Sequence, residues 1–128
     1  MKAGYLQFKP EFGKVKQNAE KVESFLYKEK FDLVVIPELS NSGYLFAEKE
    51  ELKKYSENPE NGKFCNMLKK ISREKNGYIV AGFCEEVKQG LEKVYYNSSI
   101  LVYPDGNFRI YRKTHLFFDE KKYFEPGN

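Results

Sequence analysis

The segment LVVIPELSNSGY occupies residues 33–44 and begins with five apolar residues, Leu33 to Pro37, of which three are β-branched. A short apolar run of this kind, bounded by turn residues, is typical of a strand buried on both faces of a sheet. The turn-forming residues Ser40 to Gly43 predict a loop at the carboxyl end of that strand. Binding sites of open α/β sheets form at such ends. Glu38 therefore lies where a site is expected.

The residues before this segment predict a strand followed by a helix. Residues 2–8 have a strand pattern that ends at Pro10 and Gly13. Apolar residues then recur at spacings of four, three and four, at Val15, Ala19, Val22 and Leu26. This spacing forms one face of a helix, which we expect to end near residue 29. Strand, helix and buried strand together make a βαβ unit.

The remaining residues predict two helices and three strands within one domain. The helices are expected over residues 47–55 and 64–75, and the strands over residues 78–84, 95–103 and 107–113. The last two strands are joined by Pro104-Asp105-Gly106, in which glycine supplies a positive φ. The predicted order is βαβααβββ, an α/β fold with a mixed sheet. A chain of 128 residues with 41% hydrophobic residues suffices for one domain, residues 1–128.

The composition and charge of the chain argue against two classes of binding partner. The net charge is +3, the charges of both signs are interspersed, and only three of the 22 basic residues are arginines. This pattern argues against nucleic acid and against an anionic membrane surface. The chain has no stretch near the roughly 20 apolar residues that a membrane span needs. With two cysteines and no apolar leader at Met1, we expect a cytoplasmic protein.

Few residues offer catalytic chemistry. His115 is the single histidine, the two cysteines lack metal-ligand spacing, and no glycine-rich nucleotide motif or GxSxG occurs. Carboxylates and lysines remain as the candidate catalytic residues. Glu38 is either a general base or an ordinary exposed loop carboxylate. Lys113 shares one strand face with Arg109 and Tyr111, and is either functional or part of a solvated basic face.

The final residues carry more apolar side chains than a chain terminus needs. Residues 115–128 contain five large apolar side chains and end in the turn-forming sequence EPGN. Apolar residues that lead into a turn usually precede another element. We therefore expect the fold to continue beyond Asn128.

Two motifs resemble those of the nitrilase, or carbon–nitrogen hydrolase, superfamily. VIPELSNSGY at residues 35–44 resembles its glutamate motif, and YRKTHLF at residues 111–117 resembles its lysine motif. Further matches extend over the whole chain, at residues 6–8, Asn18, residues 78–82, 96–98, 105–106 and 120–127. The resemblance implies half of a four-layer αββα sandwich.

The resemblance also implies a site and its chemistry. Glu38 would be the general base, Lys113 the cation that stabilises the tetrahedral oxyanion, and Glu120 a second glutamate that holds substrate and the leaving nitrogen. Enzymes of the family attack amide, N-carbamoyl or nitrile carbon with a cysteine thiolate, and need a proton acceptor and a fixed positive charge beside it. No cofactor or metal is implied, and homo-oligomers are common.

This chain departs from the family at the nucleophile. The family cysteine follows the lysine motif, and no cysteine follows Lys113 here. Cys84 is expected to be a small core residue, and Cys65 lies in the first turn of a predicted helix without a family counterpart. We expect the N-terminal part of a hydrolase domain that is inactive alone and associates with its C-terminal half.

Two other hypotheses remain open. In the first, the chain is a binding or subunit module that retains Glu38, Lys113 and Glu120 as a polar pocket for a small molecule. In the second, the motif matches are accidental in a small βα domain. The second hypothesis predicts that Glu38 and Lys113 lie far apart in the fold.

Overall fold

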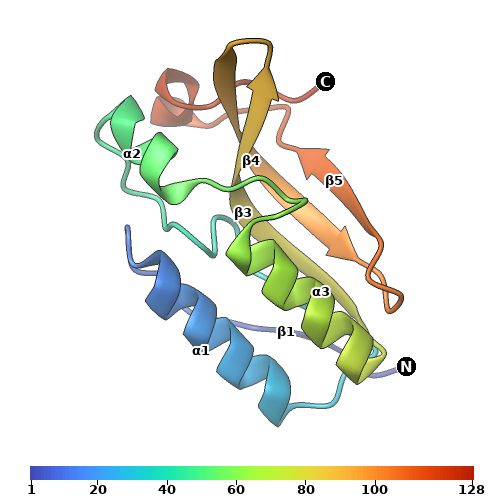
Figure 1. Ribbon diagram of the computed structural model, residues 1–128. Helices are drawn as coiled ribbons and strands as arrows, with labels where there is room; N and C mark the ends of the chain where they lie inside the picture. The colour runs from blue at the N-terminus through green and yellow to red at the C-terminus, as the bar shows by residue number, and fades with distance from the viewer.

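The computed structural model describes residues 1–128, which form a five-stranded mixed sheet with strands in the order β1-β2-β3-β4-β5 (Figure 1). Strands β1, β2 and β3 pair in parallel, whereas the β3–β4 and β4–β5 pairs are antiparallel. The strands are β1 (Ala3–Tyr5), β2 (Leu33–Ile36), β3 (Tyr78–Gln89), β4 (Glu92–Val102) and β5 (Phe108–Arg112). The helices are α1 (Val15–Lys28), α2 (Lys49–Tyr55), α3 (Lys63–Lys75) and a 3-10 helix, η1 (Phe118–Lys122). The predicted order βαβααβββ and the mixed sheet are confirmed.

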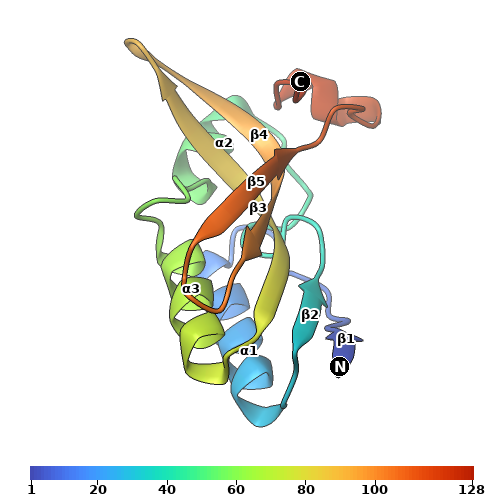
Figure 2. The same ribbon diagram turned by 90° about the vertical axis from the view of Figure 1, so that its right-hand side faces the viewer.

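Helices α1 and α3 lie side by side on one face of the sheet (Figure 2). Val22 and Leu26 of α1 and Leu68 of α3 are buried against alternate residues of β2, β3 and β4. The apolar spacing in α1 thus faces the core as predicted, because side chains three and four residues apart share one side of a helix. This helix-covered face contains the main hydrophobic core.

The opposite face of the sheet is uncovered. Val34 and Ile36 of β2 point towards the helices and are buried, but Val35 between them keeps 43% of its surface exposed. Tyr5 on β1 and Tyr111 on β5 are also exposed. The prediction that β2 is buried on both faces is therefore wrong for residues 1–128, since no element of the chain covers Val35 on this second face.

Strand β3 continues five residues beyond its predicted end at residue 84. It pairs with β4 in a long hairpin that turns at Gly90, where φ is +61°. The sequence did not predict this extension, because Glu85 is charged and a carboxylate in a strand pattern indicates a solvent-exposed position. Its side chain is only 1% exposed and pairs with Arg112 of β5 at 2.8 Å. The ion pair, with a hydrogen bond from Ser98, allows the carboxylate to be buried.

A second, smaller cluster lies at the carboxyl end of β2. It contains Leu39, Leu52 of α2, Cys84, Tyr95 and Phe124. The C-terminal segment after β5 therefore folds back onto the sheet, as the red ribbon in Figure 2 shows. This cluster anchors both segments that carry the candidate site residues.

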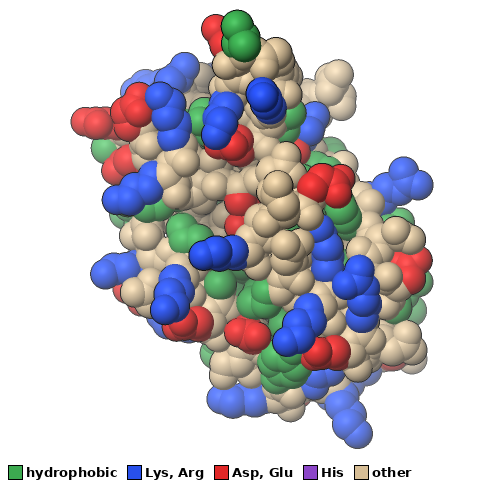
Figure 3. Space-filling view, viewed as in Figure 1, with side chains coloured by type: hydrophobic (Ala, Val, Ile, Leu, Met, Phe, Trp, Pro, Cys, Tyr) green, Lys and Arg blue, Asp and Glu red, His purple; other side chains and the backbone are tan.

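Charges of both signs are interspersed on the face shown in Figure 3. No helix combines the length and apolar character that crossing a membrane requires.

Candidate active site

Glu38 lies just beyond β2, where its backbone packs directly against β3. The Ser40 amide donates to the Gly82 carbonyl at 2.9 Å, and the Gly82 amide donates to the Pro37 carbonyl at 3.1 Å. A Cβ atom at Gly82 would lie 2.4 Å from the Cα of Glu38. Glycine at residue 82 is therefore what allows this close approach.

Two buried asparagines hold the loop that follows Glu38. The Asn18 side chain donates to the Asn41 carbonyl at 3.0 Å, and the Asn41 Oδ1 accepts the Cys84 amide at 2.9 Å. Both asparagines are fully buried. Asn18 of helix α1 and the Cys84 amide of strand β3 thus fix the loop through Asn41.

Lys113 reaches Glu38 across the sheet. Its Nζ lies 2.9 Å from Oε1 of Glu38 and 2.9 Å from Oε2 of Glu120. The three side chains are 30%, 36% and 13% exposed for Lys113, Glu38 and Glu120 respectively. The structure brings together all three residues that the sequence nominated. The hypothesis of accidental motif matches is wrong, because it requires Glu38 and Lys113 to lie apart.

Glu120 is held by donors on three sides. Besides Lys113, the Phe117 amide donates to its Oε2 at 2.6 Å and Asn97 donates to its Oε1 at 2.7 Å. Burial alone would raise the pKa of Glu120, but these hydrogen bonds and the charge of Lys113 outweigh burial and lower it. Glu120 is therefore ionised at neutral pH.

Glu38 and Glu120 also affect the pKa of Lys113. Burial alone would lower the pKa of Lys113, but its hydrogen bonds and charge interactions with Glu38 and Glu120 outweigh burial and raise it. Lys113 therefore carries a fixed positive charge at neutral pH. A fixed cation in a partly buried site can stabilise an oxyanion without reorganising.

Two further residues complete the cluster, and neither was predicted from the sequence as a site residue. Asn97 of β4 donates to Oε1 of Glu38 at 2.6 Å, and the Tyr44 hydroxyl donates to Oε2 of Glu38. Asn97 carried a usable signal. It is a polar residue within an apolar strand pattern, one hairpin away from Lys113.

The cluster opens into a hollow of about 210 Å³ on the uncovered face of the sheet. Glu38, Asn97 and Lys113 line it together with apolar side chains such as Val35 and Val80. A small polar site with apolar walls is typical of small-molecule sites.

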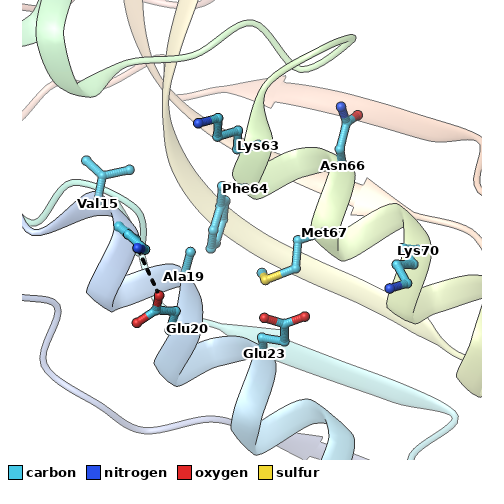
Figure 4. A pocket seen from close by; sticks show the side chains of 10 residues that line it. Val15, Ala19, Glu20, Glu23, Lys63, Phe64, Asn66, Met67 and Lys70 are labelled. Atoms are coloured by element: carbon cyan, nitrogen blue, oxygen red, sulfur yellow. Dashed lines mark ion pairs between the residues drawn. The ribbon is translucent and has the colours of Figure 1, made fainter.

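A larger groove of about 700 Å³ lies between α1 and α3 (Figure 4). Its charged side chains do not converge, and its single ion pair joins Lys16 and Glu20 of one helix at 3.9 Å. The candidate active site is therefore the smaller hollow, where the charged groups meet.

Comparison with known proteins agrees with this geometry. A sequence model of the family described as carbon-nitrogen hydrolase matches residues 2–128. The chain belongs to the carbon–nitrogen hydrolase family. It is 37% identical to a nitrilase of Pyrococcus abyssi over 100% of its own length and 48% of the relative's. It is 34% identical to a 2-oxoglutaramate amidase of Bacillus subtilis, over 96% of this chain and 47% of that one.

Solved structures of the family show the same fold. A crystal structure of an N-terminal amidase has a TM-score of 0.85 and 29% identity, and the match covers 96% of this chain and 30% of that one. This carbon–nitrogen hydrolase chain thus spans about half the length of the curated relatives described above. The predicted fold class is confirmed.

Neither cysteine of this carbon–nitrogen hydrolase chain is poised as a nucleophile. Cys65 and Cys84 are free and fully buried. Burial raises the pKa of both thiols, and the nearby Glu57 carboxylate raises it further. Cys65 lies in the first turn of α3, but Glu57 accepts the backbone amides there and cancels the activation that a helix start offers a thiol.

Proposed function

We propose that residues 1–128 are the N-terminal part of a carbon–nitrogen hydrolase domain that cleaves non-peptide C–N bonds. Glu38, Lys113 and Glu120 are the proposed catalytic residues, and a cysteine outside this chain is the proposed nucleophile. The observation that carries the proposal is the position of Lys113 Nζ, 2.9 Å from a carboxylate oxygen of each glutamate.

Each residue has a distinct proposed role. Glu38 accepts the thiol proton, and the thiolate attacks the amide carbon to form a tetrahedral oxyanion beside the Lys113 ammonium. The oxyanion collapses to a thioester, and the nitrogen leaves with the proton that Glu38 returns. Water then hydrolyses the thioester, with Glu38 as the base again. Glu120 positions Lys113 and the leaving nitrogen.

The proposed substrates are small amides, N-carbamoyl compounds or nitriles. The relatives include a nitrilase and a 2-oxoglutaramate amidase. An amide is the first choice among the three, since two further relatives are also described as amidases. No cofactor is required, because the thiol, a carboxylate and a lysine supply nucleophile, base and oxyanion stabilisation.

The uncovered sheet face supports association with the rest of the domain. Tyr5 and Tyr111 on this face, and Phe117 and Phe118 in the segment after β5, each expose more than half of their surface. Exposed apolar surface of this kind marks an interface. The proposed cover is the C-terminal part of the domain, and we also propose a homo-oligomeric, cytoplasmic protein.

The first experiment measures ammonia release from small aliphatic amides by two preparations. Residues 1–128 alone should release none, whereas the complete protein encoded by the gene should turn over. Glu38→Gln and Lys113→Met should each lower kcat/KM of the complete protein at least about 100-fold. The exposed Glu50→Gln is the matched control and should leave kcat/KM unchanged.

Other outcomes would identify a different function. Turnover by residues 1–128 alone, abolished by Glu38→Gln, would overturn the proposal that the nucleophile lies outside this chain. The second candidate, a non-catalytic module that binds a small molecule at the same pocket, is favoured by the burial of both cysteines. It predicts amide binding by residues 1–128 that Glu38→Gln weakens, and no turnover by the complete protein.

A further inference from the structure

Asn97 connects the three proposed catalytic residues. The two hydrogens of its side-chain amide are directed to different carboxylates, with Nδ2 at 2.6 Å from Oε1 of Glu38 and at 2.7 Å from Oε1 of Glu120. Its backbone carbonyl accepts the amide of Lys113 at 2.9 Å. One residue therefore contacts Glu38, Glu120 and Lys113.

The position of Asn97 makes these contacts rigid. The residue is 3% exposed and lies inside β4, between β3 and β5. Its strand neighbours Ser98 and Tyr96 point to the other face, where Ser98 donates to the buried Glu85. Asn97 thus projects towards the hollow from a strand that is paired on both sides.

The neutrality of Asn97 matters for the charge of the cluster. The cluster holds two carboxyl groups against one ammonium group. The Asn97 amide donates to both carboxylates without adding charge. It therefore favours the ionised form of Glu120, which an aspartate of the same shape would not do.

The contacts also distinguish the two oxygens of Glu38. Oε1 accepts Lys113 at 2.9 Å and Asn97 at 2.6 Å, so both of its lone-pair directions are occupied. Oε2 accepts only the Tyr44 hydroxyl, from a side chain that is 52% exposed. Oε2 is therefore the oxygen that is free to take a proton.

We infer that Asn97 is a positioning residue that holds both carboxylates against Lys113, keeps Glu120 ionised and assigns the base function to Oε2 of Glu38. The base assignment rests on the proposed function. The effect on ionisation does not, because it concerns the cluster whether or not the protein hydrolyses a substrate.

The test compares Asn97→Asp, Asn97→Ala and Ser99→Ala in the complete protein. Asn97→Asp keeps the shape and adds a third carboxylate, and Asn97→Ala removes the donor. Ser99→Ala is the matched control, since Ser99 lies on the same strand, lines the same hollow and makes no side-chain hydrogen bond to either glutamate. The first measurement is a ¹³C NMR titration of the glutamate side chains.

Both Asn97 variants should raise the Glu120 pKa, Asn97→Asp by about one unit or more, and Ser99→Ala should leave it unchanged. For amide hydrolysis, both should lower kcat about 10- to 100-fold with little change in KM, and should move the acid limb of the pH profile upwards. A structural role alone would not move that limb.

The outcomes separate the inference from the proposed function. A Glu120 pKa in Asn97→Asp equal to that in Ser99→Ala would overturn the inference, even if the protein is an amidase. A raised pKa in a protein that hydrolyses no amide would support the ionisation role and overturn the base assignment. If Asn97→Ala does not fold, the isosteric Asn97→Asp still decides the result.

Discussion

Gly82→Ala tests whether the close approach of two backbones positions Glu38, the proposed general base. The added Cβ would lie 2.4 Å from Glu38 Cα and 2.6 Å from the Pro37 carbonyl oxygen. Ordinary van der Waals contact begins at 3.4 Å, so Glu38 must move by about 1 Å. Both obstacles are backbone atoms, and no side-chain rotation relieves the overlap.

A displacement of this size has two calculable effects. We expect it to lengthen the 2.9 Å contact between Glu38 and Lys113 beyond hydrogen-bonding distance. A misplacement of about 1 Å at a reacting group costs about 100-fold in rate. Overpacking at a filled position costs about 1–3 kcal/mol of folding free energy.

The assay measures kcat/KM for amide hydrolysis and urea unfolding of the complete protein. Gly4→Ala in β1 is the matched control, because no atom lies within 4 Å of its added Cβ. Gly82→Ala should lose about 100-fold in kcat/KM and about 1–3 kcal/mol in stability, whereas Gly4→Ala should be near neutral. Equal activity and stability for the two variants would refute this account of how Glu38 is positioned.

Three other predictions follow from buried or paired ionisable groups. Arg112→Leu leaves the carboxylate of Glu85, 1% exposed, without its cation, and should cost about 3 kcal/mol in urea unfolding; Arg109→Leu, at an exposed position, should cost under about 0.5 kcal/mol. The pKa of Glu120 is lowered from 4.5 in the folded protein. Its ionisation therefore stabilises the fold above about pH 4.5, and this stabilisation is lost as the pH falls through the lower pKa of the folded state. Glu120→Gln should therefore flatten the decline of stability below about pH 4.5, and an unchanged decline would contradict the pairing. Cys65 and Cys84 are fully buried and should resist an aromatic disulfide reagent until guanidinium unfolds the protein; rapid labelling of the folded protein would show that the thiols are accessible.

Local patterns were sufficient for the order of elements and for two of the site segments. The spacing of Val22 and Leu26 predicted which side of α1 faces the core, and alternation in the last strand placed Arg109, Tyr111 and Lys113 on one face. Periodicity depends only on residues that are close in the sequence, so a single chain segment is enough to reveal it. The position of Glu38 could likewise be predicted from local sequence, because Glu38 lies just after its strand.

Other features depended on residues that are distant in the sequence. Glu85 is a strand residue because Arg112, 27 residues later, neutralises it. Val35 is exposed because nothing in residues 1–128 packs over it, although β2 has the sequence of a fully buried strand.

The candidate site shows the same division. Its three proposed catalytic residues were predicted from the family resemblance of residues 35–44, 111–117 and 120–127, but Asn97 was not predicted as a site residue. Asn97 meets Glu38 and Lys113 only because the register of β4 sets it between β3 and β5. Register is set by hydrogen bonds and packing between strands, so tertiary structure alone determines which polar side chains share a hollow.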